Sequence, residues 1–153
     1  MSLEISEDVA ESWQSLLDEK VNWVLWDTGD DAKHPVLRVA ATGTGGFSEM
    51  KASMDPSACL FGGCRVRAID VKEDLRSVRN RYIGFIYAGT STPSIKRARL
   101  TGHKPRVMPL MTNVAVSFEL IGADLSTSFT MGQVATEPIG WCGAHQPTQY
   151  EFE

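Results

Sequence analysis

The stretch that decides the fold is Ser77-Val-Arg-Asn-Arg-Tyr-Ile-Gly-Phe-Ile-Tyr87. Its second half, Tyr82–Tyr87, is an apolar and β-rich run that Ala88–Gly89 ends, which predicts a strand. Arg79 and Arg81 stand two residues apart at the start of that strand, so both side chains leave the sheet on the same side. The stretch therefore joins an apolar strand to two cationic groups that can meet one acidic partner.

Downstream, Pro93 suits the first turn of a helix that starts near Thr92. Within this helix Lys96 and Arg99 share a face at i, i+3. Pro105 and Pro109 each remove a backbone hydrogen bond and predict a bend or an interruption. The basic residues of this second cluster, which no acidic residue interrupts, are Lys96, Arg97, Arg99, Lys104 and Arg106.

The last part of the chain contains one clear strand pattern. Val114–Leu120 alternates, with Val114, Val116, Phe118 and Leu120 on one face. Asp124 begins a last short helix that holds Leu125 and Phe129. Residues 137–153 are rich in Pro, Gly and Gln and are expected to form a flexible C-terminal tail.

Upstream, Ser6 can cap a helix whose apolar face includes Val9, Trp13 and Leu16. A second, shorter helix follows the Gly-rich Thr42–Gly46 and carries Phe47, Met50 and Met54 on one face. The other segments are apolar strands or turns. They are the strands Val21–Trp26, Val36–Ala41 and Cys59–Ile69, the last bent at Gly62–Gly63, and a charged turn at Val71–Ser77.

The element order is α-β-β-α-β-β-α-β-α, which predicts an α/β (α+β) domain with one mixed sheet of five to six strands and helices on both faces. One domain is expected over residues 1–136. The core is expected to contain Trp23, Leu25, Phe85 and Val116, with Trp13 packing a helix on the sheet.

Composition restricts the classes of protein. The 153 residues carry a net charge of -4, which does not favour nucleic acid, and every Lys and Arg except Lys20 falls between Lys33 and Arg106. The three cysteines, Cys59, Cys64 and Cys142, are odd in number and predict reduced thiols in a cytosolic protein. Their spacing is not that of a zinc site, and no apolar run is long enough to span a bilayer.

The most enzyme-like stretch is Thr42-Gly-Thr-Gly-Gly46, because backbone N–H groups of a Gly-rich turn can surround a phosphate. It lacks a following Gly-Lys-Ser/Thr and is interpreted as a tight turn. His34, His103 and His145 are widely spaced and suggest no catalytic group. We therefore expect no enzyme, no catalytic residue, no metal and no cofactor.

Four stretches, in order, resemble actin-depolymerising-factor homology domains of the cofilin type, and coactosins most of all. The resemblance covers residues 6–121. The stretches are Val21-Asn-Trp-Val-Leu-Trp26, Ala41-Thr-Gly-Thr-Gly-Gly46, Ser77-Val-Arg-Asn-Arg-Tyr82 with its strand, and Ile95-Lys-Arg-Ala-Arg99 with Gly102-His-Lys104.

The resemblance implies two actin-binding surfaces. The basic loop and strand, used for filament sides, map onto Arg79 and Arg81. The long helix, which sits in the actin cleft, has a basic pair that maps onto Ile95 and Arg97, so the first partner is apolar here. Residues 124–134, the expected last helix, contain no basic residue, although family members carry charges there. The first departure favours coactosin over cofilin, and the second implies a filament affinity that is weak or that rests mostly on the basic loop and the long helix.

The resemblance implies a monomeric, cytoplasmic, cytoskeleton-associated protein that binds actin filaments and modulates their dynamics, with weak binding of monomeric actin. No nucleic acid or membrane insertion is expected. One alternative is a cofilin-type severing and depolymerising factor; another is a small enzyme or nucleotide-binding protein that uses Thr42–Gly46. The expected actin-binding residues are Arg79, Arg81, Lys96, Arg97, Arg99, Lys104 and Arg106.

Overall fold

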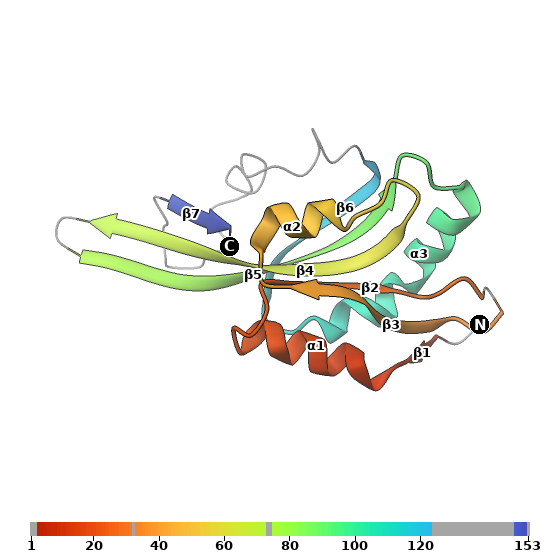
Figure 1. The fold of residues 1–153 in the computed structure, drawn as a ribbon, viewed down its shortest axis with the longest axis horizontal. Helices are drawn as coiled ribbons and strands as arrows, with labels where there is room; N and C mark the ends of the chain where they lie inside the picture. The colour runs from red at the N-terminus through yellow and green to blue at the C-terminus, as the bar shows by residue number, and fades with distance from the viewer. Residues whose placement is uncertain (1–2, 32, 73–74, 124–148, 153) are drawn as a thin grey trace.

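The apolar run Tyr82–Tyr87 lies inside a strand, as its pattern predicts, but that strand is much longer than the run. The computed structural model describes residues 3–31, 33–72, 75–123 and 149–152. In this part of the chain, helices lie against a curved sheet from which a long hairpin projects (Figure 1). The elements are β1 (Glu4–Ile5), α1 (Glu7–Leu17), β2 (Trp23–Asp27), β3 (Val36–Gly43), α2 (Gly46–Ala52), β4 (Cys59–Lys72), β5 (Leu75–Gly89), α3 (Ser94–Val107), the 3-10 turn η1 (Met108–Leu110), β6 (Val114–Ala123) and β7 (Gln149–Phe152).

The sheet has seven strands in the order β1-β3-β2-β4-β5-β6, with β7 paired to β4. Strands β3, β2, β4 and β5 are antiparallel neighbours, whereas β1 runs parallel to β3 and β6 runs parallel to β5. The mixed sheet and the α+β class are therefore confirmed. The strand count exceeds the expected five to six because β1 and β7, of 2 and 4 residues, are too short to leave a periodic pattern.

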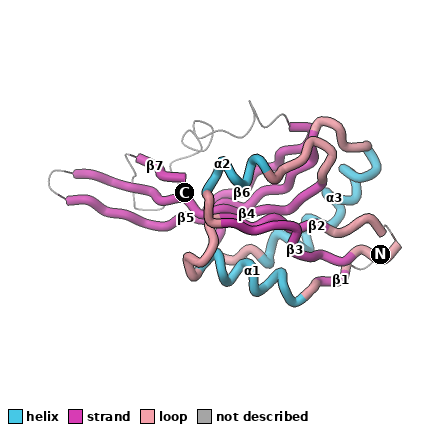
Figure 2. The backbone as a smooth tube through the Cα atoms, in the orientation of Figure 1, coloured by secondary structure: helices cyan, strands magenta, loops and turns pink. Residues whose placement is uncertain are grey.

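Helices cover both faces of the sheet, as predicted (Figure 2). Alternate residues of β2 divide the core: Trp23 and Leu25 pack toward α2, and Val24 and Trp26 pack toward α1 and α3. Trp23, Leu25, Phe85 and Trp13 are all buried, which confirms four of the five core predictions. The fifth residue, Val116, lies in β6, but its side chain is outside the described part of the structure.

Helix α1 is fixed to the sheet by its own Trp13 and by Arg65 of β4. Trp13 lies edge-on to Trp26, with the two ring centroids 5.9 Å apart. Its indole Nε1 donates to the carbonyl of Thr112 at 3.0 Å. At the other end of the helix, Nη1 of the buried Arg65 donates to the carbonyls of Leu16 and Val21. Because unpaired carbonyls end every helix, this guanidinium stabilises the C-terminus of α1.

The glycines Gly62–Gly63, where a bend is predicted, do not interrupt β4, which pairs with β2 and β5 through both of them without a register shift. Their small size serves packing instead. A Cβ on Gly62 would lie 2.4 Å from the Phe85 ring on one face, and a Cβ on Gly63 would lie 2.3 Å from the Trp13 ring on the other. The two glycines let an aromatic ring approach the sheet from each side.

The charged turn predicted at Val71–Ser77 is wrong for most of that range. The ladder between β4 and β5 continues to the pairs Val71–Arg76 and Lys72–Leu75, so most of this stretch is strand. Charged side chains are compatible with a strand whose faces are exposed to solvent, and backbone pairing decides the structure here. The hairpin β4–β5 consequently projects from the body of the domain (Figure 1).

Three further expectations concern the second half of the chain. Helix α3 continues through Pro105 and ends at Val107. A proline this close to the end of a helix removes only one backbone hydrogen bond, so the helix is not broken there. Pro109 lies in η1. Gln149–Phe152 forms β7 beside β4, although it falls in the range expected as a tail. The expected last helix, residues 124–134, and the rest of the expected tail lie outside the described residues.

Candidate functional site

The two arginines that open the sequence argument lie within β5, not in a loop before it. Arg79 is paired with Ala68, and Arg81 with Val66, in the β4–β5 ladder. Side chains alternate along a strand, so both arginines share the face of Ile83, which packs toward α2. Arg79 is exposed and Arg81 is half-buried. The Nη1 atom of Arg81 donates to the carbonyl of Asn80 at 3.3 Å.

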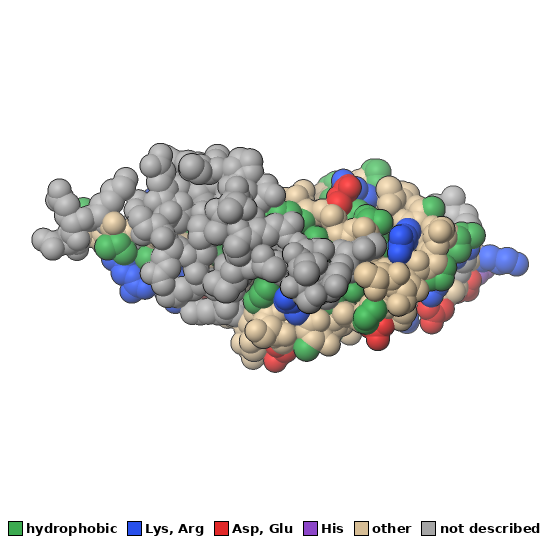
Figure 3. Space-filling model, turned by 90° about the horizontal axis from the view of Figure 1, so that it is seen from above, with side chains coloured by type: hydrophobic (Ala, Val, Ile, Leu, Met, Phe, Trp, Pro, Cys, Tyr) green, Lys and Arg blue, Asp and Glu red, His purple; other side chains and the backbone are tan. Residues whose placement is uncertain are grey.

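The hairpin also exposes apolar side chains that the sequence interpretation missed. Leu75 is 77% exposed and Val71 is 50% exposed. At the projecting end of the molecule, Lys and Arg side chains lie beside hydrophobic ones (Figure 3). The sequence signal was the presence of three apolar residues, Val71, Leu75 and Val78, within a charged stretch, which the interpretation as a turn left unexplained. The hairpin can therefore offer a partner both charge and apolar area.

The cations of α3 divide into two groups. Arg97, Lys104 and Arg106 bind other parts of the chain. Nη2 of Arg97 donates to the carbonyls of Gly89 and Thr90, each at 3.4 Å. These bonds hold the segment that leads from β5 into α3, so Arg97 contributes to the structure of the domain.

Lys104 and Arg106 tie the end of α3 to its neighbours. Lys104 forms an ion pair with Glu119 of β6. Nε of Arg106 donates to the carbonyl of Leu3, at the N-terminal end of the described chain, at 3.0 Å. A cation that already pairs within the protein must give up part of that interaction to bind a partner, so both residues are less available than their charge suggests.

Lys96 and Arg99 form the second group. Both are exposed, and neither side chain makes an ion pair or hydrogen bond within residues 3–31, 33–72, 75–123 and 149–152. They line a cavity of about 320 Å³ between α3, the start of β4 and the turn that links β2 to β3. Their common helix face was predicted from the spacing, whereas the acidic wall opposite them was not.

The two basic regions do not form one continuous surface. Arg79 and Arg81 lie on the α2 face of the sheet, whereas α3 packs through Leu100 and Val107 in the core of the α1 face. The hairpin and α3 also lie at opposite ends of the domain (Figure 1). A single partner that contacts both must therefore reach around the sheet, or the two regions serve different partners.

The Gly-rich turn does not present its amides to a phosphate. Gly45 donates its N–H to Oε1 of Glu49 at 3.2 Å, and Gly46 donates to Oδ1 of Asn22 at 3.1 Å. Gly46 has a φ of 81°, which agrees with the prediction of a tight turn. These amides are therefore satisfied by the chain's own side chains.

The two described cysteines are unpaired, as predicted. Cys64 is buried in the core, and burial raises the pKa of its thiol to about 12. Cys59 is half-buried at the edge of the cavity, where burial also raises its pKa. Cys142 lies outside the described residues. None of the described helices has the length and apolarity to cross a membrane.

A family model described as cofilin/tropomyosin-type actin-binding protein matches residues 2–127. The chain belongs to this family. The family assignment agrees with the resemblance derived from the four sequence stretches, and it makes the chain an actin-binding protein. No curated protein matches the chain significantly.

Solved structures of the family have the same fold at low sequence identity. Coactosin from Entamoeba histolytica is 23% identical, with a TM-score of 0.70 over 87% of this chain and 91% of that one. Cofilin from Streptomyces griseoflavus is 16% identical, with a TM-score of 0.67 over 82% and 89%. Mouse coactosin, described as an actin filament binding protein, is 16% identical, with a TM-score of 0.61 over 90% and 100%.

Proposed function

We propose that this chain binds the sides of actin filaments and modulates filament turnover, without catalysis and without strong severing. The observation that carries the proposal is the projecting β4–β5 hairpin, which presents Arg79 and Arg81 on one face. Guanidinium groups suit bidentate contacts with carboxylates, which abound on the surface of an acidic partner such as actin. A projecting strand pair can reach such a surface without rearrangement of the domain.

The state of α3 favours filaments over monomers. The position that should carry the first cation of the cleft-binding pair is Ile95, which is apolar and 61% exposed. The second, Arg97, already donates to Gly89 and Thr90. Lys96 and Arg99 remain available on α3 but face the cavity. The helix therefore contributes less charge to an actin cleft than its sequence suggests, and we expect weak binding of monomeric actin.

A solved structure of the family also favours filament binding. Mouse coactosin is described as an actin filament binding protein, and it shares the fold of this chain over its whole length. We assign filament binding to this chain by that likeness together with the geometry of the hairpin. Association with the cytoskeleton would follow from filament binding, and we propose that the chain acts as a monomer.

Co-sedimentation tests the proposal. Purified chain is mixed with polymerised actin at low and at moderate salt, and the pelleted fraction is measured. We expect saturable pelleting that weakens as salt rises, since exposed charged contacts are screened. Filament lengths are then measured by fluorescence microscopy. Unchanged lengths support the coactosin-like function, whereas rapid shortening supports the cofilin-type alternative. Absence of pelleting at low salt would reject filament binding.

A further inference from the structure

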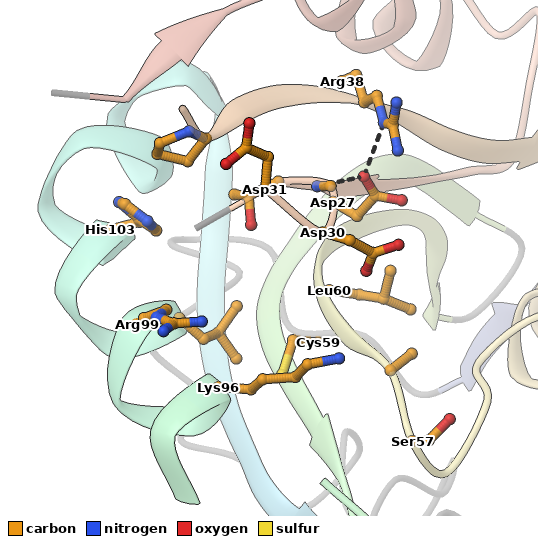
Figure 4. A pocket seen from close by; sticks show the side chains of 15 residues that line it. Asp27, Asp30, Asp31, Arg38, Ser57, Cys59, Leu60, Lys96, Arg99 and His103 are labelled. Atoms are coloured by element: carbon orange, nitrogen blue, oxygen red, sulfur yellow. Dashed lines mark hydrogen bonds and ion pairs between the residues drawn. The ribbon is translucent and has the colours of Figure 1, made fainter. Parts of the chain in front are cut away.

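The cavity beside α3 has a composition that actin binding does not explain. It lies at the end of the domain away from the projecting hairpin, between the β2–β3 turn, the start of β4 and one face of α3 (Figures 1 and 4). Its volume is about 320 Å³, which falls at the small end of the range for ligand pockets in proteins.

The inner surface of the cavity is apolar. Leu60 and Leu100 are 5% and 4% exposed, and both line it. The half-buried Cys59 also lines the cavity, beside the side chain of Lys96 (Figure 4). Because Leu60 and Leu100 are almost fully buried, the aliphatic surface that a ligand could cover here is small, and its burial contributes only a small part of the binding free energy.

One wall is cationic. Lys96 and Arg99 project from α3 toward the cavity, one helical turn apart (Figure 4). Among the described residues neither has an ion-pair partner, which sets them apart from Arg97, Lys104 and Arg106 on the same helix. The charge of this wall is thus not neutralised within the described fold.

The facing wall is anionic. Asp27 is neutralised, because its Oδ1 pairs with Nε of Arg38 at 3.1 Å. Oδ1 of Asp31 accepts the N–H groups of Lys33 and His34 at 3.0 and 3.3 Å, which holds the turn and fixes its carboxylate beside the cavity. Asp30 has no hydrogen bond or ion pair within the described chain, and its carboxylate lies near the centre of the opening (Figure 4).

The two walls carry opposite charges, yet Lys96 and Arg99 do not pair with Asp30 or Asp31. The space between them holds the charges apart. The electrostatic complement of this arrangement is a molecule with an anionic end against α3, a cationic end against the turn, and an apolar middle. A simple anion or a simple cation would meet one favourable wall and one repulsive wall.

We propose that this cavity binds a small zwitterion, an amino-carboxylate with an aliphatic spacer. The carboxylate accepts hydrogen bonds from Lys96 and Arg99, the ammonium group donates to Asp30 and Asp31, and the spacer covers Leu60 and Leu100. This assignment goes beyond actin binding and does not depend on it.

Three matched probes test the charge pattern. They are 6-aminohexanoate, which has both ends, hexanoate, which has the anion only, and hexylamine, which has the cation only. Each is titrated into the full chain, and binding is followed through the backbone amide signals of residues 27–31, 57–60 and 96–103. Each exposed charged contact changes affinity by at most about fivefold, so we expect 6-aminohexanoate to bind several-fold more tightly than either single-ended probe.

Two variants separate the walls. Asp30→Asn should weaken the binding of 6-aminohexanoate and of hexylamine, and should leave the binding of hexanoate unchanged or make it tighter. Lys96→Met should weaken the binding of 6-aminohexanoate and of hexanoate, but not the binding of hexylamine. Arg79→Ala combined with Arg81→Ala is the matched control and should leave all three titrations unchanged. Circular dichroism and thermal midpoints verify that each variant is folded.

Several results would overturn the proposal. If hexanoate binds as tightly as 6-aminohexanoate, the cavity is a simple anion site. Amide shifts spread outside the three segments, or equal affinities in all variants, would show adventitious binding only. Binding of a Lys-Glu dipeptide without binding of 6-aminohexanoate would assign the cavity to a protein segment. The titrations contain no actin, so their failure leaves the filament proposal unaffected, and failure of pelleting leaves the titrations unaffected.

Discussion

The indole Nε1 of Trp26 donates to the hydroxyl oxygen of Ser12 at 2.8 Å, and both residues are buried. The same hydroxyl donates to the carbonyl of Val9 at 2.7 Å. Ser12 thus satisfies a polar group of the sheet from within α1. Ser12→Ala should leave the indole N–H unpaired in the core and lower the free energy of unfolding by about 1–3 kcal/mol.

Denaturant unfolding measures this change. Ser48→Ala is the matched control, because Ser48 is also helical but exposed. Its effect should stay within about 0.5 kcal/mol. Equal midpoints for Ser12→Ala and the parent protein would mean that water or another acceptor replaces the hydroxyl.

Leu25 lies at the centre of the sheet with 1% of its side chain exposed. Leu25→Ala removes buried methyl groups and leaves a cavity against Phe85 and Gly62, so it should cost about 2–5 kcal/mol. Leu75→Ala removes the same atoms from a side chain that is 77% exposed, and should cost little. Similar losses for the two variants in denaturant unfolding would contradict the assigned core.

Local periodicity was enough to predict the body of the domain. The apolar, β-rich run Val21–Trp26 identified β2, and the helical spacing of Val9, Trp13 and Leu16 identified α1. The outer part of the β4–β5 hairpin was missed because its residues pair through the backbone, while their side chains have the composition of a turn. Strand β7 was missed because its partner, Val66–Ile69, is more than 70 residues away in the sequence.

The sequence also predicted part of the candidate site, namely the face that Arg79 and Arg81 share, but not the roles of the individual cations of α3. The i, i+2 spacing of Arg79 and Arg81 correctly placed both on one face. The spacing of the α3 cations could not distinguish Arg97, which binds the carbonyls of Gly89 and Thr90, from Arg99, which faces the cavity. That distinction depends on which backbone carbonyls and carboxylates the fold brings near each guanidinium, and these come from distant segments.

The thiols of Cys59 and Cys64 should differ in reactivity in the native protein. The thiolate is the reactive form, and burial raises the pKa of Cys64 to about 12 and blocks access to it. Cys59 is only half-buried, so it should react with 5,5′-dithiobis(2-nitrobenzoate) before Cys64 does. Mass spectrometry of peptides from partly labelled protein locates the modification. Early labelling of Cys64 would show that the core opens locally.

His103 faces the cavity, and burial lowers its pKa below the ordinary value. The unfolded chain therefore binds a proton more readily than the folded one. As pH falls from above the unfolded pKa through the folded pKa, this residue should lower stability slightly. A proton NMR titration of the imidazole should give a midpoint below about 6.5. A midpoint above that value would mean that Asp30 or Asp31 stabilises the imidazolium.

Arg79→Ala combined with Arg81→Ala should abolish pelleting with actin filaments while the thermal midpoint stays close to that of the parent. The two side chains share one face of β5, and at both positions the backbone is paired with β4. Little backbone freedom is lost when they bind, so most of the contact energy contributes to affinity. A desolvated, hydrogen-bonded charge costs about 2–5 kcal/mol on truncation, enough to remove binding of moderate strength.

The matched control for this experiment is Arg67→Ala combined with Arg76→Ala. It removes the same charge from the same hairpin, but from the opposite face, since Arg67 pairs with Asn80 and Arg76 with Val71 in the ladder. If only net charge mattered, both double variants would bind filaments equally weakly, because electrostatic association would be slower for both. A face-specific contact should make the first variant fail at moderate salt while the second still pellets. If both pellet like the parent, the filament contact lies elsewhere, and α3 becomes the surface to test next.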